Sequence, residues 1–154
     1  MAAESDTAGV AAPPPLIHAV GLTAGLLLNA AAPVGRVPAP MRAIGALPLL
    51  AGISFIGLSL REMRRARTNV SPYKPTEALV EAGPYRLSRN PIYVGFALIH
   101  AGVGLLTGAA WALVSLVPAV AVIRFGVIDR EERYLRRRLG RPYEEYAARV
   151  RRWL

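Results

Sequence analysis

Cysteine is absent from this chain of 154 residues. Its absence excludes a disulfide framework, a thiol nucleophile and any metal centre that relies on cysteine ligands. Histidine is scarce as well, since His18 and His100 are the only two, and both lie in apolar runs with no carboxylate at ligand spacing. We therefore expect neither a zinc nor an iron site in this protein.

The strand pattern, in which polar and apolar residues alternate, is missing too. Without a strand there is no Gly-x-Gly-x-Gly turn of the kind that holds dinucleotides beside a parallel sheet. Gly102-Val103-Gly104 lies within an apolar run, where glycine allows close contact between membrane helices. The sequence thus predicts helices and no Rossmann domain.

Acidic residues are few, with 10 against 19 lysines and arginines, and the formal net charge is +9. Such an excess would suit nucleic acid, and it would equally suit the cytoplasmic flanks of membrane helices. The apolar residues, 53% of the chain, decide between the two because they form long blocks. We therefore predict a multi-pass integral membrane protein whose partners are membrane lipids and not nucleic acid.

Four apolar runs predict an all-α fold. They would form an integral membrane helical bundle with about four transmembrane helices, a C-terminal helical hairpin, and cytosolic or interfacial helices after it. A helix that crosses the hydrocarbon core of a bilayer needs about 20 apolar residues. The runs are Leu16–Val34, Met41–Leu60, Pro91–Thr107 and Ala109–Ile128.

Proline and polar residues refine this outline. Pro48 is expected to kink the second membrane helix, and the arginine-rich segment 61–67 is expected to prolong that helix into the headgroup region. Pro72 and Pro75 exclude a regular helix between the second and third runs. Residues 1–15 predict a disordered tail, followed by one membrane domain over 16–154.

The order of the runs determines the topology. Gly108 alone separates the last two runs, so they should form an antiparallel hairpin. With four spans, the N-terminal tail, the 61–90 loop and the C-terminal segment share one side of the membrane. Because the other side holds only Arg36 and Arg42, the positive-inside rule places both termini in the cytoplasm.

Aromatic residues mark the C-terminal segment. After the break at Gly140-Arg141-Pro142, Tyr143, Tyr146, Val150 and Trp153 recur at near-helical spacing with arginines between them. Two placements fit this pattern. The helix could lie in the membrane interface, or it could pack on the cytosolic face of the protein itself.

A polar cluster lies where the basic loop meets the third run. The segment reads Gly83-Pro84-Tyr85-Arg86-Leu87-Ser88-Arg89-Asn90-Pro91-Ile92-Tyr93-Val94-Gly95. Asn90 before Pro91 predicts a helix start, with the Asn90 side chain as N-cap and Pro91 at the first helical position. Because the third and fourth helices are similar in length, Glu131 and Glu132 should lie within a turn or two of Asn90 and Tyr93.

Such a cluster would suit a zwitterionic ligand. The positive end of the helix would take a carboxylate, and Glu131 would take an ammonium group. Each member also has a structural alternative: Asn90 as a cap alone, Tyr85 and Tyr93 as interface anchors, and Glu131 as a partner of nearby arginines. For Glu132 we favour pairing with arginine.

Together these residues resemble a known family. The matching features are Gly83-Pro84-Tyr85, then Arg89-Asn90-Pro91-Ile92-Tyr93-Val94-Gly95, then Glu131-Glu132 with Leu135, Gly140, Tyr143, Tyr146 and Val150. Over about residues 68–153 their order and spacing resemble the C-terminal half of the isoprenylcysteine carboxyl methyltransferases and the related phospholipid N-methyltransferases. Those are integral membrane enzymes that use S-adenosylmethionine without a Rossmann domain.

The resemblance implies a cofactor site. It implies contacts to S-adenosylmethionine from Leu79, Val80, Tyr85, Asn90, Pro91, Ile92, Tyr93 and Glu131. The eukaryotic enzymes carry histidine at the position of Asn90, and asparagine keeps hydrogen bonding but takes up no proton near neutral pH. Their substrate-binding arginine falls on Val127 here, which argues against a prenylcysteine carboxylate as substrate.

We therefore expect an S-adenosylmethionine-dependent membrane methyltransferase that acts on the carboxylate, amine or hydroxyl of a lipophilic or prenylated acceptor. Arg89 and Arg124 are candidates for contact with this substrate, although Arg124 could instead snorkel to the headgroups. No residue is an obvious general base, so none is assigned as catalytic. Two alternatives stay open: an NADPH-dependent reductase of the sterol-reductase type, and a non-enzymatic membrane protein that binds lipid headgroups.

Overall fold

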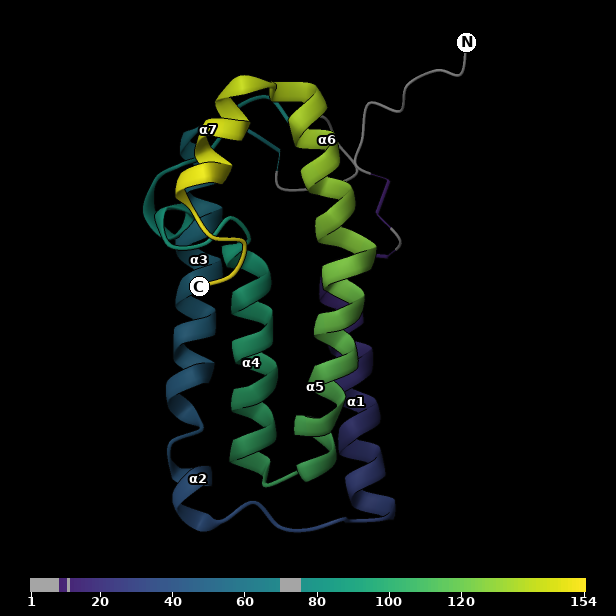
Figure 1. Cartoon of the computed structure of the whole chain (residues 1–154). Helices are drawn as coiled ribbons and strands as arrows, with labels where there is room; N and C mark the ends of the chain where they lie inside the picture. Colours follow the sequence, from purple (N-terminus) through teal and green to yellow (C-terminus); the bar gives the residue numbers. More distant parts are fainter. Residues whose placement is uncertain (1–8, 11, 70–75) are drawn as a thin grey trace.

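Four long helices form the body of the protein. The computed structural model describes residues 9–10, 12–69 and 76–154. The long helices are α1 (Pro14–Ala31), α3 (Ala46–Arg65), α4 (Pro91–Thr107) and α5 (Ala110–Ile123) (Figure 1). The shorter elements are α2 (Ala39–Ala43), the 3-10 turn η1 (Gly83–Arg86), the π-helical turn η2 (Arg124–Ile128), α6 (Asp129–Leu139) and α7 (Arg141–Arg149). The predicted all-α fold class is confirmed.

The long helices pack in a simple order. α3 packs along α4, α4 packs against α5, and α5 packs against α1 (Figure 1). Gly108, with φ of +69°, connects α4 to α5 in a left-handed conformation that glycine adopts without a steric penalty. The Gly108 N–H bonds to the Leu105 carbonyl oxygen at 3.0 Å, which ends α4 and starts the antiparallel partner. The predicted hairpin is therefore present.

The bundle has the length and surface of a membrane protein. Three helical stretches are long and apolar enough to cross a bilayer: Pro14–Ala31, Ala39–Arg65 and Ala110–Leu139. The helix Pro91–Thr107 is apolar but shorter. Large apolar side chains such as Leu27, Leu47 and Val117 face outward, where lipid tails would cover them. A dense run of charged residues begins at Asp129, so α6 leaves the apolar part of the bundle.

One predicted detail of the second run is wrong. The chain is interrupted at Ile44-Gly45, between α2 and α3, and not at Pro48. Pro48 lies in the first turn of α3, where the missing N–H costs little because the first N–H groups of a helix have no partner inside it. A proline in this position starts a helix and does not kink one.

The N-terminal tail is only partly described. Residues 1–8 and 11 of the predicted disordered tail lie outside the described residues. Val10 is buried against Ile123, Val127 and Ile128. Pro14 already belongs to α1, so the first helix begins two residues before the apolar run.

Two histidines connect α1 to α4 inside the bundle. His18 and His100 are both buried, and their Nδ1 atoms lie 3.2 Å apart. His100 Nε2 also lies 2.9 Å from the Ala112 carbonyl oxygen on α5. If Nε2 carries the His100 proton, it donates to this carbonyl and Nδ1 accepts from His18. His18 therefore faces a neighbouring helix, as expected for a polar residue in a membrane span.

Glycine lets α3 and α4 approach closely. A Cβ atom added to Gly52 would lie 2.5 Å from the Gly95 carbonyl oxygen, and one added to Gly102 would lie 2.6 Å from the Leu49 backbone nitrogen. These distances are too short for any side chain. Gly57, also on α3, has no atom within 4 Å of such a Cβ and faces outward.

We predict that Gly52→Ala destabilises the bundle by about 1–3 kcal/mol, because the methyl group overpacks the α3–α4 contact. Gly57→Ala is the matched control, and it should be neutral or stabilising by up to about 1 kcal/mol because alanine favours the helix. The melting temperatures of both variants in detergent test this prediction. Equal loss of stability in the two variants would contradict the close packing of α3 on α4.

Candidate functional site

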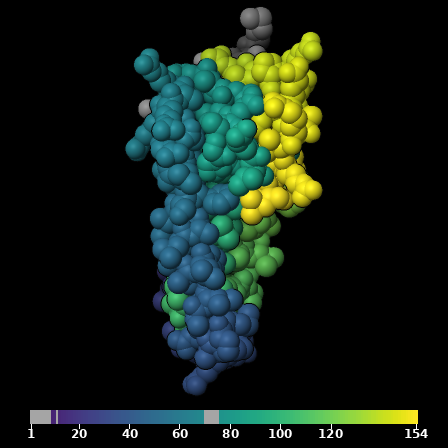
Figure 2. Space-filling model, turned by 90° about the vertical axis from the view of Figure 1, so that its left-hand side faces the viewer, coloured from purple at the N-terminus to yellow at the C-terminus, as the bar shows by residue number. Residues whose placement is uncertain are grey.

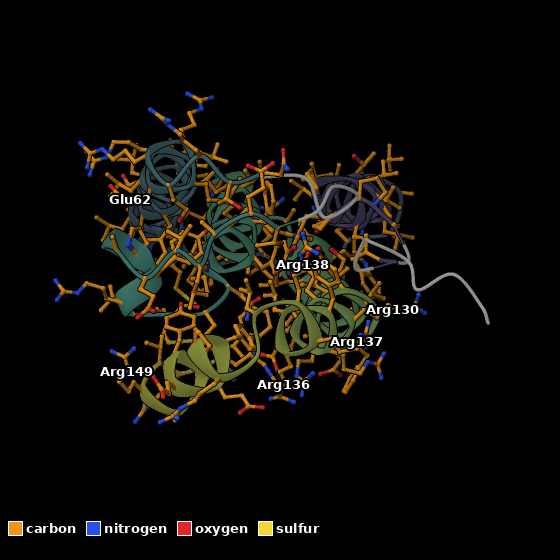
Figure 3. All side chains as sticks on the ribbon, turned by 90° about the horizontal axis from the view of Figure 1, so that it is seen from above. Glu62, Arg130, Arg136, Arg137, Arg138 and Arg149 are labelled. Atoms are coloured by element: carbon orange, nitrogen blue, oxygen red, sulfur yellow. The ribbon has the colours of Figure 1, made fainter. Side chains whose placement is uncertain are left out.

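A pocket lies at the charged end of the bundle. It is formed by the loop from Thr76 to Asn90, the first turn of α4, the inner face of α6 and the side of α7. Seen from above, exposed arginines such as Arg130, Arg136 and Arg149 surround this end (Figure 3). The lining residues that the sequence predicted are Leu79, Val80, Tyr85, Arg89, Asn90, Pro91, Ile92, Tyr93 and Glu131.

The hairpin brings α4 and α6 together as the helix lengths indicated. The Tyr93 hydroxyl donates a hydrogen bond to Glu131 Oε1 at 2.7 Å. These residues are 38 positions apart in the sequence. The carboxylate that we expected near the start of α4 therefore lies there, and the contact joins the two walls of the pocket.

The start of α4 is held differently from our expectation. Asn90 occupies the N-cap position, but its side chain makes no capping hydrogen bond. Its Nδ2 instead donates to the Arg152 carbonyl oxygen at 3.0 Å, and its backbone N–H donates to Ser88 Oγ at 3.1 Å. The predicted side-chain cap is therefore wrong, because a carbonyl from the C-terminal segment takes the Asn90 amide.

Glu131 and Glu132 have opposite surroundings. Glu132 is buried and accepts two hydrogen bonds from the Arg152 guanidinium, at 2.7 and 2.6 Å. Arg89 lies 3.4 Å and Arg136 3.8 Å from the same carboxylate. Glu131 forms no ion pair with any residue that the structure describes, although arginines surround this end of the chain. The pairing favoured for Glu132 is thus present. Glu131 has no cationic partner among the described residues, and burial raises its pKa to about 7.

Phenols make up much of the pocket wall. The lining tyrosines are Tyr85, Tyr93, Tyr134, Tyr143 and Tyr146. Tyr134 accepts a hydrogen bond from the Thr76 N–H at 3.0 Å, and Tyr146 donates to the Tyr85 carbonyl oxygen at 2.8 Å. Burial, and then the negative charge of Glu131, raise the pKa of Tyr85 well above its ordinary value. Tyr85 therefore stays protonated at neutral pH and acts as a neutral donor near Glu131.

The C-terminal helix packs on the protein itself. Tyr143 and Tyr146, on one face of α7, are both buried. Their spacing was visible in the sequence and fitted two placements equally well. The contacts select the packed placement, because these tyrosines close one side of the pocket.

Arg124 does not line the pocket. Its guanidinium pairs with Asp129 and lies over the Phe125 ring, 5.3 Å from the ring centroid. Arg89 does line the pocket, and its Nε is buried without a hydrogen-bond partner in the described part of the chain. Of the two arginines considered for substrate, Arg89 is thus the one that reaches the site.

Sequence reasoning missed the role of Arg152. This residue is 20 positions from Glu132 and 62 from Asn90, and it contacts both. Arginine is the commonest charged residue of this end of the chain, so composition and spacing give no signal that separates Arg152 from its neighbours. The contacts of Arg152 with Glu132 and Asn90 are seen only in the structure, where the last residues of the chain return to the start of α4.

Fold and site together define a class of protein. It is a helical membrane bundle with a tyrosine-lined pocket at its charged end, where the Glu131 carboxylate lies beside the first turn of α4. The profile of the phospholipid methyltransferase family matches residues 41–141. The chain belongs to this family.

One curated relative adds a second comparison. The chain is similar to the cobalt-zinc-cadmium resistance protein CzcN of Cupriavidus metallidurans, with 34% identity over 105 residues. The match covers 67% of this chain and 48% of the relative, so the chain spans about half the length of that protein. No solved structure matches the chain.

We predict that the two adjacent glutamates differ in their effect on stability. Glu132→Gln should destabilise the ligand-free protein by about 3 kcal/mol, because it removes the buried carboxylate that Arg89 and Arg152 contact. Glu131→Gln should change stability little, since Glu131 has no ion pair to lose. Melting temperatures in detergent without ligand test this. If Glu131→Gln destabilised as much as Glu132→Gln, Glu131 would be structural and not a ligand group.

Proposed function

We propose that this protein transfers a methyl group from S-adenosylmethionine to a lipophilic or prenylated acceptor in the membrane. The observation that carries the proposal is the carboxylate of Glu131, which accepts a hydrogen bond from Tyr93 in a pocket at the start of α4 and has no cationic partner within residues 9–10, 12–69 and 76–154. A carboxylate without a cationic partner favours a ligand that brings its own positive charge. S-adenosylmethionine brings two, an ammonium and a sulfonium.

The pocket offers a complementary group for each part of this donor. Glu131 would bind the ammonium group, and the N-terminal end of α4, beside Asn90, Pro91 and Ile92, would attract the carboxylate. The phenols of Tyr85 and Tyr93 would surround the sulfonium, which aromatic faces attract as they attract other cations. The apolar Leu79 and Val80 would contact the adenosine.

The reaction needs alignment more than acid–base chemistry. The sulfonium carbon is already electrophilic: a nucleophilic atom of the acceptor bonds to the methyl carbon, and the carbon–sulfur bond breaks to leave a neutral thioether. The chain would then contribute by holding donor and acceptor in line. Asn90 takes up no proton near neutral pH, and its amide is already engaged by Arg152. A carboxylate acceptor would react as the anion, and an amine or hydroxyl acceptor would release its proton to water, since Asn90 cannot act as the base.

The acceptor would reach the pocket from the bilayer, and the donor from the cytoplasm. The distribution of arginines supports this orientation, since only Arg36 and Arg42 lie at the opposite end of the bundle. Arg89 lines the pocket and offers its guanidinium to the acceptor or the donor. Arg124, paired with Asp129 away from the pocket, would meet an acceptor only at the membrane surface.

We predict that the purified protein binds S-adenosylmethionine in detergent, measured by calorimetry, and that Glu131→Gln raises the Kd by about 10- to 100-fold. A hydrogen bond to a charged group contributes roughly 1.5–3 kcal/mol, which accounts for this range. Glu144→Gln is the matched control, because Glu144 is an exposed glutamate on α7 and its loss changes the net charge equally.

Three outcomes would count against the proposal. Unchanged affinity in Glu131→Gln would remove this residue from the ammonium site. Binding of NADPH without binding of S-adenosylmethionine would favour a reductase. Absence of any nucleoside ligand would favour a non-enzymatic role. Membranes incubated with methyl-labelled S-adenosylmethionine and then separated into lipid and protein fractions would identify the class of acceptor.

A further inference from the structure

The last residues of the chain lie at the open end of the α4–α5 hairpin, beside the start of α4. After α7 the chain turns back and passes beside the start of α4 (Figure 1). In the side view, the C-terminal part of the chain (yellow) lies next to the loop that precedes α4 (teal) (Figure 2). We call residues 150–154 the C-terminal strap. The family profile matches residues 41–141, so the strap lies outside the matched region, while the polar groups that it contacts lie inside it.

The side chain of Arg152 binds one wall of the pocket. Its Nε and Nη2 donate to the two oxygens of Glu132 at 2.7 and 2.6 Å, a bidentate geometry that arginine forms readily with carboxylates. Nη2 also lies 3.8 Å from Asp129. Glu132 is buried, with 4% of its side chain exposed, so this pair fixes the first turn of α6.

The backbone of the strap binds the other wall. The Arg152 carbonyl oxygen accepts hydrogen bonds from Asn90 Nδ2 at 3.0 Å and from Ser88 Oγ at 3.2 Å. The neighbouring Arg151 carbonyl oxygen accepts from the Arg89 N–H at 2.8 Å. These three contacts hold the last residues before α4, of which Arg89 and Asn90 line the pocket.

Trp153 fixes the strap on its apolar side. Its ring packs against the buried cluster of Val10, Ile123, Val127 and Ile128. Tyr93 packs against the same cluster. The strap is therefore anchored by polar contacts on one side and by apolar contacts on the other, next to the residue that donates to Glu131.

We propose that Arg152 is the positioning residue of the cofactor pocket. One residue ties α6, through Glu132, to the start of α4, through Asn90 and Ser88. It thereby sets the separation across which Tyr93 and Glu131 meet. Arg152 acts through these groups and does not line the pocket itself. This inference rests on the proposed function, because it concerns the site that would bind S-adenosylmethionine.

The first test compares two neighbouring arginines. Arg152→Ala should raise the Kd for S-adenosylmethionine by about tenfold or more, since it removes the bidentate partner of the buried Glu132 carboxylate and the link from α6 to the start of α4. Arg151→Ala should leave the Kd unchanged, because the Arg151 side chain is exposed and its backbone carbonyl remains. Equal Kd values for Arg152→Ala and the wild type would overturn the proposal.

A double-mutant cycle and a rescue distinguish positioning from general stability. If Arg152 acts through Glu132, the effects of Arg152→Ala and Glu132→Gln on the Kd should be strongly non-additive. Added guanidinium ion should restore part of the affinity of Arg152→Ala and none of that of Glu131→Gln. Arg152→Lys keeps the charge but loses the bidentate geometry, and it serves if Arg152→Ala does not fold. Additive effects together with a failed rescue would contradict a positioning role.

A measurement on the ligand-free protein distinguishes failure of this inference from failure of the proposed function. Trp111 and Trp153 are the only tryptophans, so Trp111→Phe leaves Trp153 as a single reporter of the strap. In that background, Arg152→Ala should shift the Trp153 emission to the red and increase its quenching by acrylamide, and Arg151→Ala should not. A strap that is released while the wild type binds no S-adenosylmethionine would refute the function alone. A strap that stays docked in Arg152→Ala would refute the positioning role alone.

Discussion

The ion pair between Arg152 and Glu132 is the interaction on which the charged end of this protein depends. A buried carboxylate loses its hydration and is tolerated only where partners replace the lost water. Here the partners come from three different segments: Arg89 from the loop before α4, Arg136 from α6 itself, and Arg152 from the strap. The ion pairs of the Glu132 carboxylate therefore hold these three segments together.

The same constraint separates the roles of two adjacent glutamates. Successive residues of a helix point in different directions, so Glu132 faces the strap while Glu131 faces Tyr93 and the pocket. Arginine neutralises the first and leaves the second uncompensated. A structural ion pair next to an unpaired carboxylate is thus a consequence of helix geometry, and it gives the pocket a preference for cationic ligands.

The membrane part supplies a rigid base for this arrangement. Gly52, Gly95 and Gly102 allow α3 and α4 to pack with their backbones in contact, and His18 with His100 joins α1 to α4. In a bilayer, close packing stabilises helix association where the hydrophobic effect does not, because lipid tails are as apolar as the helix surfaces. The hairpin of α4 and α5 then places the start of α4 and the start of α6 at one end. The proposed methyl transfer would take place at that end.

The sequence by itself determined the helical class, the bounds of α4 and the turn at Gly108, because hydropathy, breaker residues and helix length are local properties. Most of the predicted residues that line the pocket came instead from the resemblance to a family of methyltransferases. Local patterns placed the break of the second run at Pro48, whereas the chain breaks at Ile44-Gly45. They also assigned the Asn90 side chain to a cap. Only the tertiary structure decided that Asn90 binds Arg152 and that α7 packs on the protein. The physical reason is that these contacts join residues far apart in the chain, 62 positions in the case of Asn90 and Arg152, so no local pattern encodes them.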